Sequence, residues 1–273
     1  MTPDELRVAG FLDPRRALGF FEELPGGAEV WAADLGASAD PDQGLLAAIR
    51  LHEADPGLVR GLVDDAAARR RVCAVLGGSQ WLGDYIIADP ARARATWEDP
   101  GEAARVMLAS VGATRGERGV FVASEDARVD DLRGAYRRVL LYLAADDLTS
   151  DDPEGLMPAV GLRIADLVDA TLEAGLALAR RDIDPQGLIP FAIIAMGKTG
   201  ARELNYISDV DVVYVAEAGA DGDERVALEV ATRLAAATAS ACSGPGTEAP
   251  LWTVDANLRP EGRNGALVRT VES

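Results

Sequence analysis

Apolar residues in the first part of the chain recur at three- and four-residue spacing, between turns rich in Pro, Gly and Asp. This spacing places apolar side chains on one face of an α-helix. It predicts short helices within residues 1–25, one helix over residues 56–76, and another that begins with Ser79 as its N-cap. The clearest helices are expected over residues 129–146 and 156–181. We therefore expect this part of the chain to be helical.

The pattern changes after Gly187. Residues 188–195 form a short apolar run of strand length, and residues 210–215 form a second run rich in β-branched and aromatic side chains. An amphipathic helix is expected over residues 223–241, followed by a third short strand over residues 251–254. This last part of the chain therefore mixes strands with helices.

Together, the two patterns predict an α+β fold. An all-helical N-terminal region is expected over residues 1–125. A second domain is expected over residues 126–273, in which long helices precede a small mixed sheet that starts at about residue 187.

Acidic residues outnumber basic ones, with 45 Asp and Glu against 27 Lys and Arg and a formal net charge of −18. Binding to the backbone of nucleic acids depends on clustered Lys and Arg that release counterions. The charge balance therefore disfavours nucleic acid as a partner and polynucleotide synthesis as an activity. It fits a soluble protein that meets other proteins or small nucleotides.

The sequence has two widely separated cysteines, Cys73 and Cys242, and one histidine, His52. This argues against a zinc site and against a disulfide framework. Asp4 and Glu5 interrupt the first turn, so no signal peptide is expected, and no apolar run is long enough to span a membrane. We expect a cytoplasmic protein without a membrane partner.

Two carboxylates, Asp209 and Asp211, stand at the start of the second predicted strand. Residues two apart in a strand point to the same face, where two carboxylates repel each other unless a cation lies between them. Mg²⁺ is commonly bound by one or two carboxylates together with substrate phosphates. Asp255, which follows the third predicted strand, would supply a third carboxylate. Asp209, Asp211 and Asp255 are therefore the predicted catalytic residues and magnesium ligands.

A glycine-rich turn with Gly197, Lys198 and Gly200 follows the first predicted strand. Glycines there would let backbone N–H groups approach a phosphate, and Lys198 would add a positive charge. Taken alone, a Gly-Lys pair or two spaced aspartates carry little information. In this order and on these predicted elements, they point to phosphate chemistry.

Residues 196–214, Met-Gly-Lys-Thr-Gly-Ala-Arg-Glu-Leu-Asn-Tyr-Ile-Ser-Asp-Val-Asp-Val-Val-Tyr, closely resemble the signature of the glutamine synthetase adenylyltransferase/adenylyl-removing enzymes. Residues 254–262 resemble the family's segment around its third carboxylate. That family belongs to the polymerase-beta nucleotidyltransferase superfamily. The resemblance implies a polymerase-beta-like core in which Asp209, Asp211 and Asp255 hold magnesium. It also implies that the turn of Gly197, Lys198 and Gly200, with Ser208, binds the nucleotide.

Members of this family carry two nucleotidyltransferase halves, of which one strips AMP from a tyrosine of glutamine synthetase with phosphate, releasing ADP. The chain resembles that N-terminal half cut short at Ser273. The resemblance implies adenylylated glutamine synthetase, ATP or ADP, and phosphate as partners, and a place in the control of nitrogen assimilation. We expect this chain alone to bind nucleotide weakly with magnesium and to turn over poorly.

Two alternatives stay open at this stage. The first is forward transfer of AMP from ATP to glutamine synthetase. The second is a non-catalytic module that binds nucleotide or a PII-type signalling protein, against which the three carboxylates speak.

Several nearby residues also have simpler interpretations. Ser208 and Asn205 could shape the turn before Asp209 instead of contacting a ligand. Arg202 is equally consistent with a local ion pair. Arg259 is expected to be a solvated loop residue, and the Gly-Gly before Ser79 a helix stop.

Overall fold

The computed structural model describes residues 1–218 and 223–272. The chain divides into two compact units, the first made of residues 1–100 and 138–157, the second of residues 101–137 and 158–273. The predicted domain boundary at residue 125 remains a prediction.

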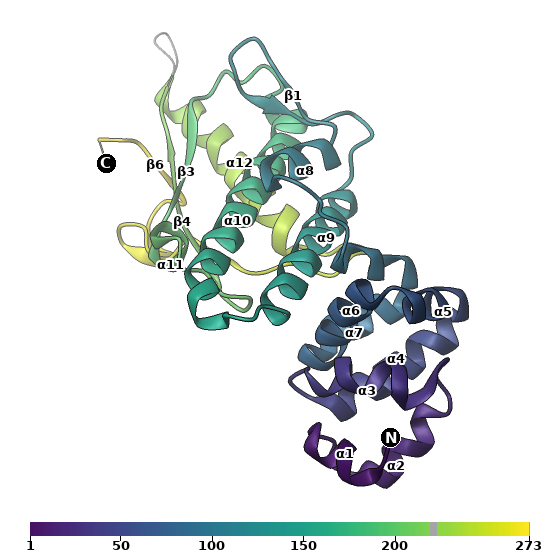
Figure 1. The fold of residues 1–273 in the computed structure, drawn as a ribbon. Coiled ribbons are helices and arrows are strands. Elements are labelled where there is room, and N and C mark those ends of the chain that lie inside the picture. The colour runs from purple at the N-terminus through teal and green to yellow at the C-terminus, as the bar shows by residue number, and fades with distance from the viewer. Residues whose placement is uncertain (219–222, 273) are drawn as a thin grey trace. The chain divides into compact units, whose positions relative to one another are not determined.

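The first unit is built from helices (Figure 1). These are α1 (Pro3–Val8), α2 (Pro14–Phe21), α3 (Gly27–Gly36), α4 (Pro41–Ala54), α5 (Pro56–Asp64), α6 (Ala66–Gly78), α7 (Gln80–Ala88) and the 3₁₀ helix η1 (Pro90–Thr96), together with residues 138–148 of α9 (Val129–Leu148). Their apolar faces form one core around the buried side chains of Trp31, Leu35, Leu45 and Leu76. The expectation of helices in this region is confirmed.

One expected helix is divided in two. The pattern over residues 56–76 predicted a single helix, whereas α5 ends at Asp64 and α6 begins at Ala66. The reason is Asp65, whose carboxylate accepts a hydrogen bond from the N–H of Ala68 and so caps a new helix. Ser79 acts as predicted, because its hydroxyl accepts a hydrogen bond from the N–H of Leu82 at the start of α7.

The second unit holds the strands. Its elements are α8 (Ala103–Ser110), β1 (Thr114–Arg115), β2 (Phe121–Val122), the first half of α9, most of α10 (Pro153–Ile183), β3 (Phe191–Ala195), α11 (Gly197–Ala201), β4 (Val210–Ala216), α12 (Glu224–Ser243), β5 (Val254–Asp255), the 3₁₀ helix η2 (Gly262–Asn264) and β6 (Val268–Arg269). The short β1–β2 hairpin falls within the region expected to be helical. Two-residue strands are too short to show a period in the sequence.

The main sheet is small and mixed, as expected. β3 and β4 pair antiparallel, with Phe191 opposite Ala216 and Ala195 opposite Val212. On its other side, β4 pairs in parallel with β5 and further along with β6. The α+β fold class is therefore confirmed, while β6 was not predicted.

Helices cover one face of this sheet (Figure 1). Leu176 and Ala179 of α10 and Leu234 of α12 form a core against which Phe191 and Ile193 of β3 pack. Four alternate residues of β4 are buried, and these are Val210, Val212, Tyr214 and Ala216. The residues between them face the open side of the sheet.

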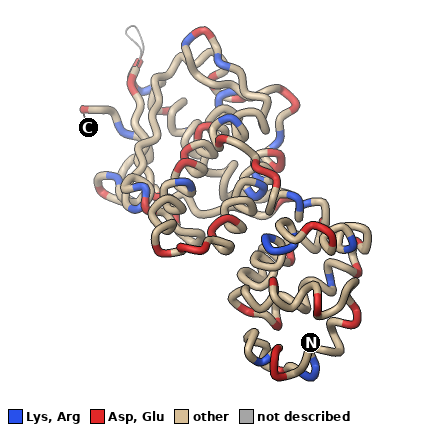
Figure 2. The backbone as a smooth tube through the Cα atoms, in the orientation of Figure 1, with Lys and Arg blue, Asp and Glu red and all other residues tan. Residues whose placement is uncertain are grey.

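Acidic positions outnumber basic ones in both units (Figure 2). Within residues 1–218 and 223–272, every helix is too short or too polar to span a membrane.

Candidate functional site

The carboxylates of β4 lie on the open face of the sheet because of the alternation along this strand. Val210 and Val212 are buried, so Asp211 between them and Asp209 before them point to the opposite side. Asp211 is partly buried and Asp209 is exposed. The core therefore fixes the direction in which both predicted ligands point.

Asp255 joins this face through strand pairing. β5 pairs in parallel with β4 so that Val254 is opposite Val210 and Asp255 is opposite Asp211. Paired residues of neighbouring strands present their side chains to the same face, about 5 Å apart at the backbone. Residues 44 positions apart in the sequence, Asp211 and Asp255, are thus neighbours.

The turn after β3 is held close to Asp211. The N–H of Met196 donates to the carbonyl oxygen of Asp211 at 2.9 Å. Gly197 follows with a φ of +51°, and a Cβ at this position would lie 2.5 Å from Oδ2 of Asp211. Only a glycine allows both this conformation and this approach.

This geometry predicts a large cost for Gly197→Ala. The added methyl would strain the backbone and displace the Asp211 carboxylate, so we expect a loss of about 1–3 kcal/mol in the free energy of unfolding. Urea denaturation measures this. Gly134→Ala is the matched control, because a Cβ on Gly134 in the middle of α9 meets nothing within 4 Å and alanine favours helices. Equal effects of both substitutions would contradict the assigned strain.

The other residues of the predicted turn have different environments. Lys198 is exposed, whereas a Cβ on Gly200 would lie 2.5 Å from the carbonyl oxygen of Ala195, so Gly200 lets α11 pack against β3. The hydroxyl of Ser208 donates to Oδ1 of Asn205 at 2.9 Å, within the turn that precedes Asp209. Their roles toward a nucleotide remain predictions.

Nearby arginines make local contacts. Arg202 forms ion pairs with Asp166 and Asp169 of α10, which tie the end of α11 to that helix. Arg259 donates to the carbonyl oxygens of Ala256 and Gly265 and so closes the loop between β5 and β6. The sequence left open whether Arg202 forms a local ion pair or contacts a substrate. The structure contains the ion pair.

The three aspartates suit a magnesium ion by the chemistry of their donors, since Mg²⁺ prefers carboxylate oxygens. Gly197 leaves space beside Asp211 that a side chain would fill. Among residues 1–218 and 223–272, however, no three His, Cys, Asp or Glu side chains lie close enough to hold a metal ion by themselves. One oxygen of Asp255 accepts a hydrogen bond from the N–H of Asn257 at 2.7 Å. These residues therefore fit an ion that is bound jointly with nucleotide phosphates better than one bound by protein alone.

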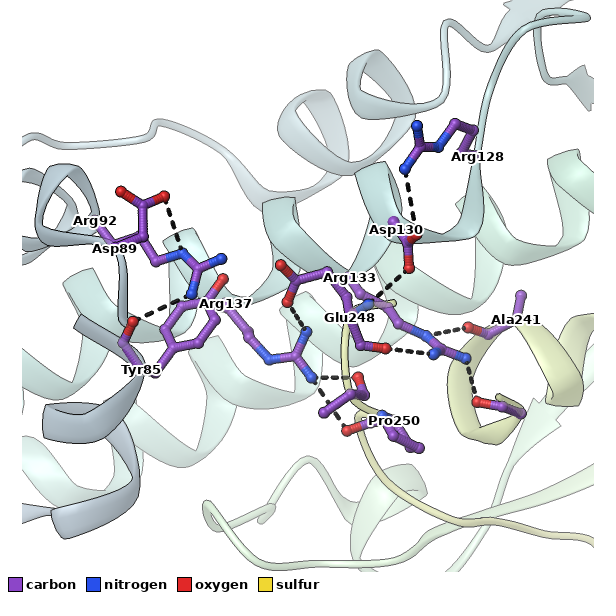
Figure 3. A network of polar contacts seen from close by, with 12 residues as sticks. Tyr85, Asp89, Arg92, Arg128, Asp130, Arg133, Arg137, Ala241, Glu248 and Pro250 are labelled. Carbon is purple, nitrogen blue, oxygen red and sulfur yellow. Dashed lines mark hydrogen bonds and ion pairs between the residues drawn. The ribbon is translucent and has the colours of Figure 1, made fainter. Parts of the chain in front are cut away.

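Two buried arginines of α9 hold the segment that leads to Asp255, a feature that the sequence did not reveal (Figure 3). Arg133 donates to four carbonyl oxygens at and beyond the end of α12, those of Ser240, Ala241, Gly244 and Glu248. Arg137 pairs with the carboxylate of Glu248 at 2.9 Å and donates to the carbonyl oxygens of Ala249 and Pro250. We call Arg133 and Arg137 the arginine clamp.

Cys242, the cysteine of this unit, is unsuited to a reaction. Cys242 is buried, and burial raises the pKa of its thiol to about 12. It therefore stays protonated near neutral pH and is a poor nucleophile.

Comparison with known proteins gives a consistent result. Residues 69–273 match the family described as glutamate-ammonia ligase adenylyltransferase. Relatives named bifunctional glutamine synthetase adenylyltransferase/adenylyl-removing enzyme include one from Streptomyces avermitilis, 42% identical over 97% of this chain and 26% of the relative. Others come from Leifsonia xyli, 40% identical over 87% and 25%, and Mycobacterium bovis, 39% identical over 89% and 24%. The chain thus spans about a quarter of the length of the curated relatives it matches.

Proposed function

Because the chain belongs to the glutamate-ammonia ligase adenylyltransferase family, we propose that its open sheet face removes AMP from an adenylylated tyrosine of glutamine synthetase. The reaction is a phosphorolysis. An oxygen of inorganic phosphate forms a bond to the phosphorus of the AMP group, the bond from phosphorus to the tyrosine oxygen breaks, and ADP leaves. The tyrosine oxygen takes up the proton that hydrogen phosphate gives up, so that ADP and the unmodified tyrosine are the products.

The observation that carries the proposal is the pairing of Asp211 with Asp255 across two parallel strands, with Asp209 on the same face. Carboxylates on paired strand positions, such as Asp211 and Asp255, repel each other unless a cation lies between them. The relatives are named for both adenylyl transfer and adenylyl removal, which agrees with such a site.

The composition of the chain supports a role for Lys198. Of the 27 Lys and Arg residues, 26 are arginines, and Lys198 is the single lysine. Arginine and lysine bind phosphates differently, because lysine is a compact point charge and arginine a broad planar fork. All basic residues of the chain except Lys198 are arginines. A lysine beside Gly197 therefore fits a requirement for the smaller cation at a phosphate site with little room.

In this proposal, different residues bind the cation and the phosphate. Asp209, Asp211 and Asp255 hold a divalent cation, for which we propose Mg²⁺, and Lys198 binds a phosphate of the nucleotide. Gly197 keeps the turn close to Asp211, so that phosphate and carboxylate lie within reach of one ion. When bound, such an ion supplies positive charge that polarises the phosphorus and stabilises the leaving oxygen.

The experiment that tests the proposal combines this chain with adenylylated glutamine synthetase, inorganic phosphate and Mg²⁺, and follows ADP. We expect slow formation of ADP that requires both phosphate and Mg²⁺. A parallel reaction with unmodified glutamine synthetase and ATP follows incorporation of AMP and tests the forward direction. If AMP is incorporated into glutamine synthetase in the second reaction and no ADP forms in the first, the chain catalyses the forward transfer and the proposed direction is wrong.

Variants of the lysine give the matched control. We expect Lys198→Ala to weaken binding of ADP with Mg²⁺, and Lys198→Arg to restore it only in part, since the guanidinium is larger. Calorimetric titration measures both. If neither variant changes the affinity, and the chain forms no ADP, the proposed function is wrong.

A further inference from the structure

A cavity of about 580 Å³ opens in the second unit at the end of the β3–β4 hairpin that lies away from the aspartates. Its walls come from the segment after β1, from α10, from the residues before β3 and from the end of β4. Ala216, at this end of β4, is five residues from Asp211, which corresponds to about 16 Å along a strand. The cavity is therefore separate from the candidate active site.

The lining combines apolar surface with positive charge. Leu188, Ala192 and Val215 are apolar lining residues, and Arg118 and Arg180 are basic ones. Glu217 and Arg118 are both exposed, so water screens their charges, and Arg180 is the buried charge of the lining. The volume is within the range of small-molecule sites, which are largely apolar with a few polar groups.

Arg180 is the unusual member of this lining. It is 4% exposed, and its Nε has no hydrogen-bond partner among the described residues. Its ion pair with the half-exposed Glu173 is long, at 3.6 Å. Burial lowers the pKa of Arg180 from its ordinary value, although Glu173 and Asp184 oppose this. Nε itself is buried and out of reach of a ligand, but the guanidinium has five N–H donors and only one long ion pair among the described residues, so donors remain for an anionic ligand in the cavity.

We propose that this cavity is a binding site for a small organic anion. A carboxylate or phosphate group of the ligand meets Arg180 and Arg118, and its apolar body contacts Leu188 and Val215. The site is independent of the proposed nucleotidyl transfer, since none of the three aspartates takes part.

The test uses hexanoate and hexyl phosphate as probes, with hexan-1-ol as the uncharged control. Amide chemical shifts, measured by two-dimensional NMR on the intact chain, locate the binding site. Both anions are expected to move the resonances of Leu188, Ala192 and Glu217, and the alcohol is not. The tighter of the two anions then identifies the group that the site prefers.

Substitutions connect binding to the residues. Arg180→Met keeps most of the side-chain length and removes the positive charge. Because that charge makes only one long ion pair, with Glu173, the protein is expected to remain folded. It should weaken anion binding about tenfold or more. Arg233→Ala, on the exposed face of α12, is the matched control and should leave binding unchanged.

A second variant keeps the proposal testable if Arg180→Met lowers the thermal unfolding temperature. Ala192→Phe places a ring in the cavity from an exposed strand position and should prevent binding. The proposal is overturned if hexan-1-ol binds as tightly as hexanoate. It is also overturned if the shifted resonances lie elsewhere, or if binding survives Ala192→Phe.

Discussion

Asp211→Asn is expected to abolish Mg²⁺-dependent binding of ADP while the protein remains folded. Asp211 lies at the centre of the site, opposite Asp255 and against Gly197. Mutation of a residue that hydrogen-bonds to a metal ligand typically lowers the metal affinity about 10- to 100-fold. Loss of a ligand itself should therefore lower it by about 100-fold or more. Because asparagine relieves the repulsion between carboxylates, the unfolding temperature should stay the same or rise slightly.

Calorimetric titration of ADP with and without Mg²⁺ measures this effect. Asp182→Asn serves as the control, since Asp182 pairs on the surface with Arg181 at the end of α10. Its ADP affinity should equal that of the unmodified protein. Undiminished Mg²⁺-dependent binding in Asp211→Asn would show that the ion is held elsewhere.

The second large effect is expected from the arginine clamp. Arg133 is fully buried and is bonded to four carbonyl oxygens around the end of α12 (Figure 3). Methionine would fill much of its volume but donate no hydrogen bonds, leaving these acceptors unpaired. Since the last carbonyl groups of a helix have no partner within it, Arg133→Met should cost about 3 kcal/mol or more in the free energy of unfolding.

Hydrogen exchange distinguishes this role from general packing. Protection should fall first in residues 240–250, the segment that the clamp holds before β5. Arg225→Ala provides the comparison, because Arg225 forms an exposed ion pair with Glu229 four residues on, which contributes only about 0.5 kcal/mol. If the losses in Arg133→Met and Arg225→Ala are similar, the clamp contributes little.

Local patterns allowed much of the site to be predicted. The alternation along residues 210–216 shows that Asp209 and Asp211 share a face, and the structure has that alternation. The strand after residue 187 and the long helices were also predicted within a few residues of α10 and β3. In each case the information is contained in one continuous segment.

Features that depend on pairing between distant segments could not be predicted. The register of Asp211 with Asp255 depends on where β5 docks, and the two-residue strand β6 has no period of its own. Arg133 looks like a surface residue of a helix, because its carbonyl partners lie more than 100 residues away. The cavity beside Arg180 is likewise formed by segments that the sequence does not connect.

The single lysine has a practical consequence for studying this protein. Lys198 is exposed, and the other ε-amines of a typical protein are absent from the sequence. Reductive methylation with ¹³C-formaldehyde would therefore label one side chain besides the amino terminus. The single side-chain signal would report on the turn beside Asp211 without any engineered tag.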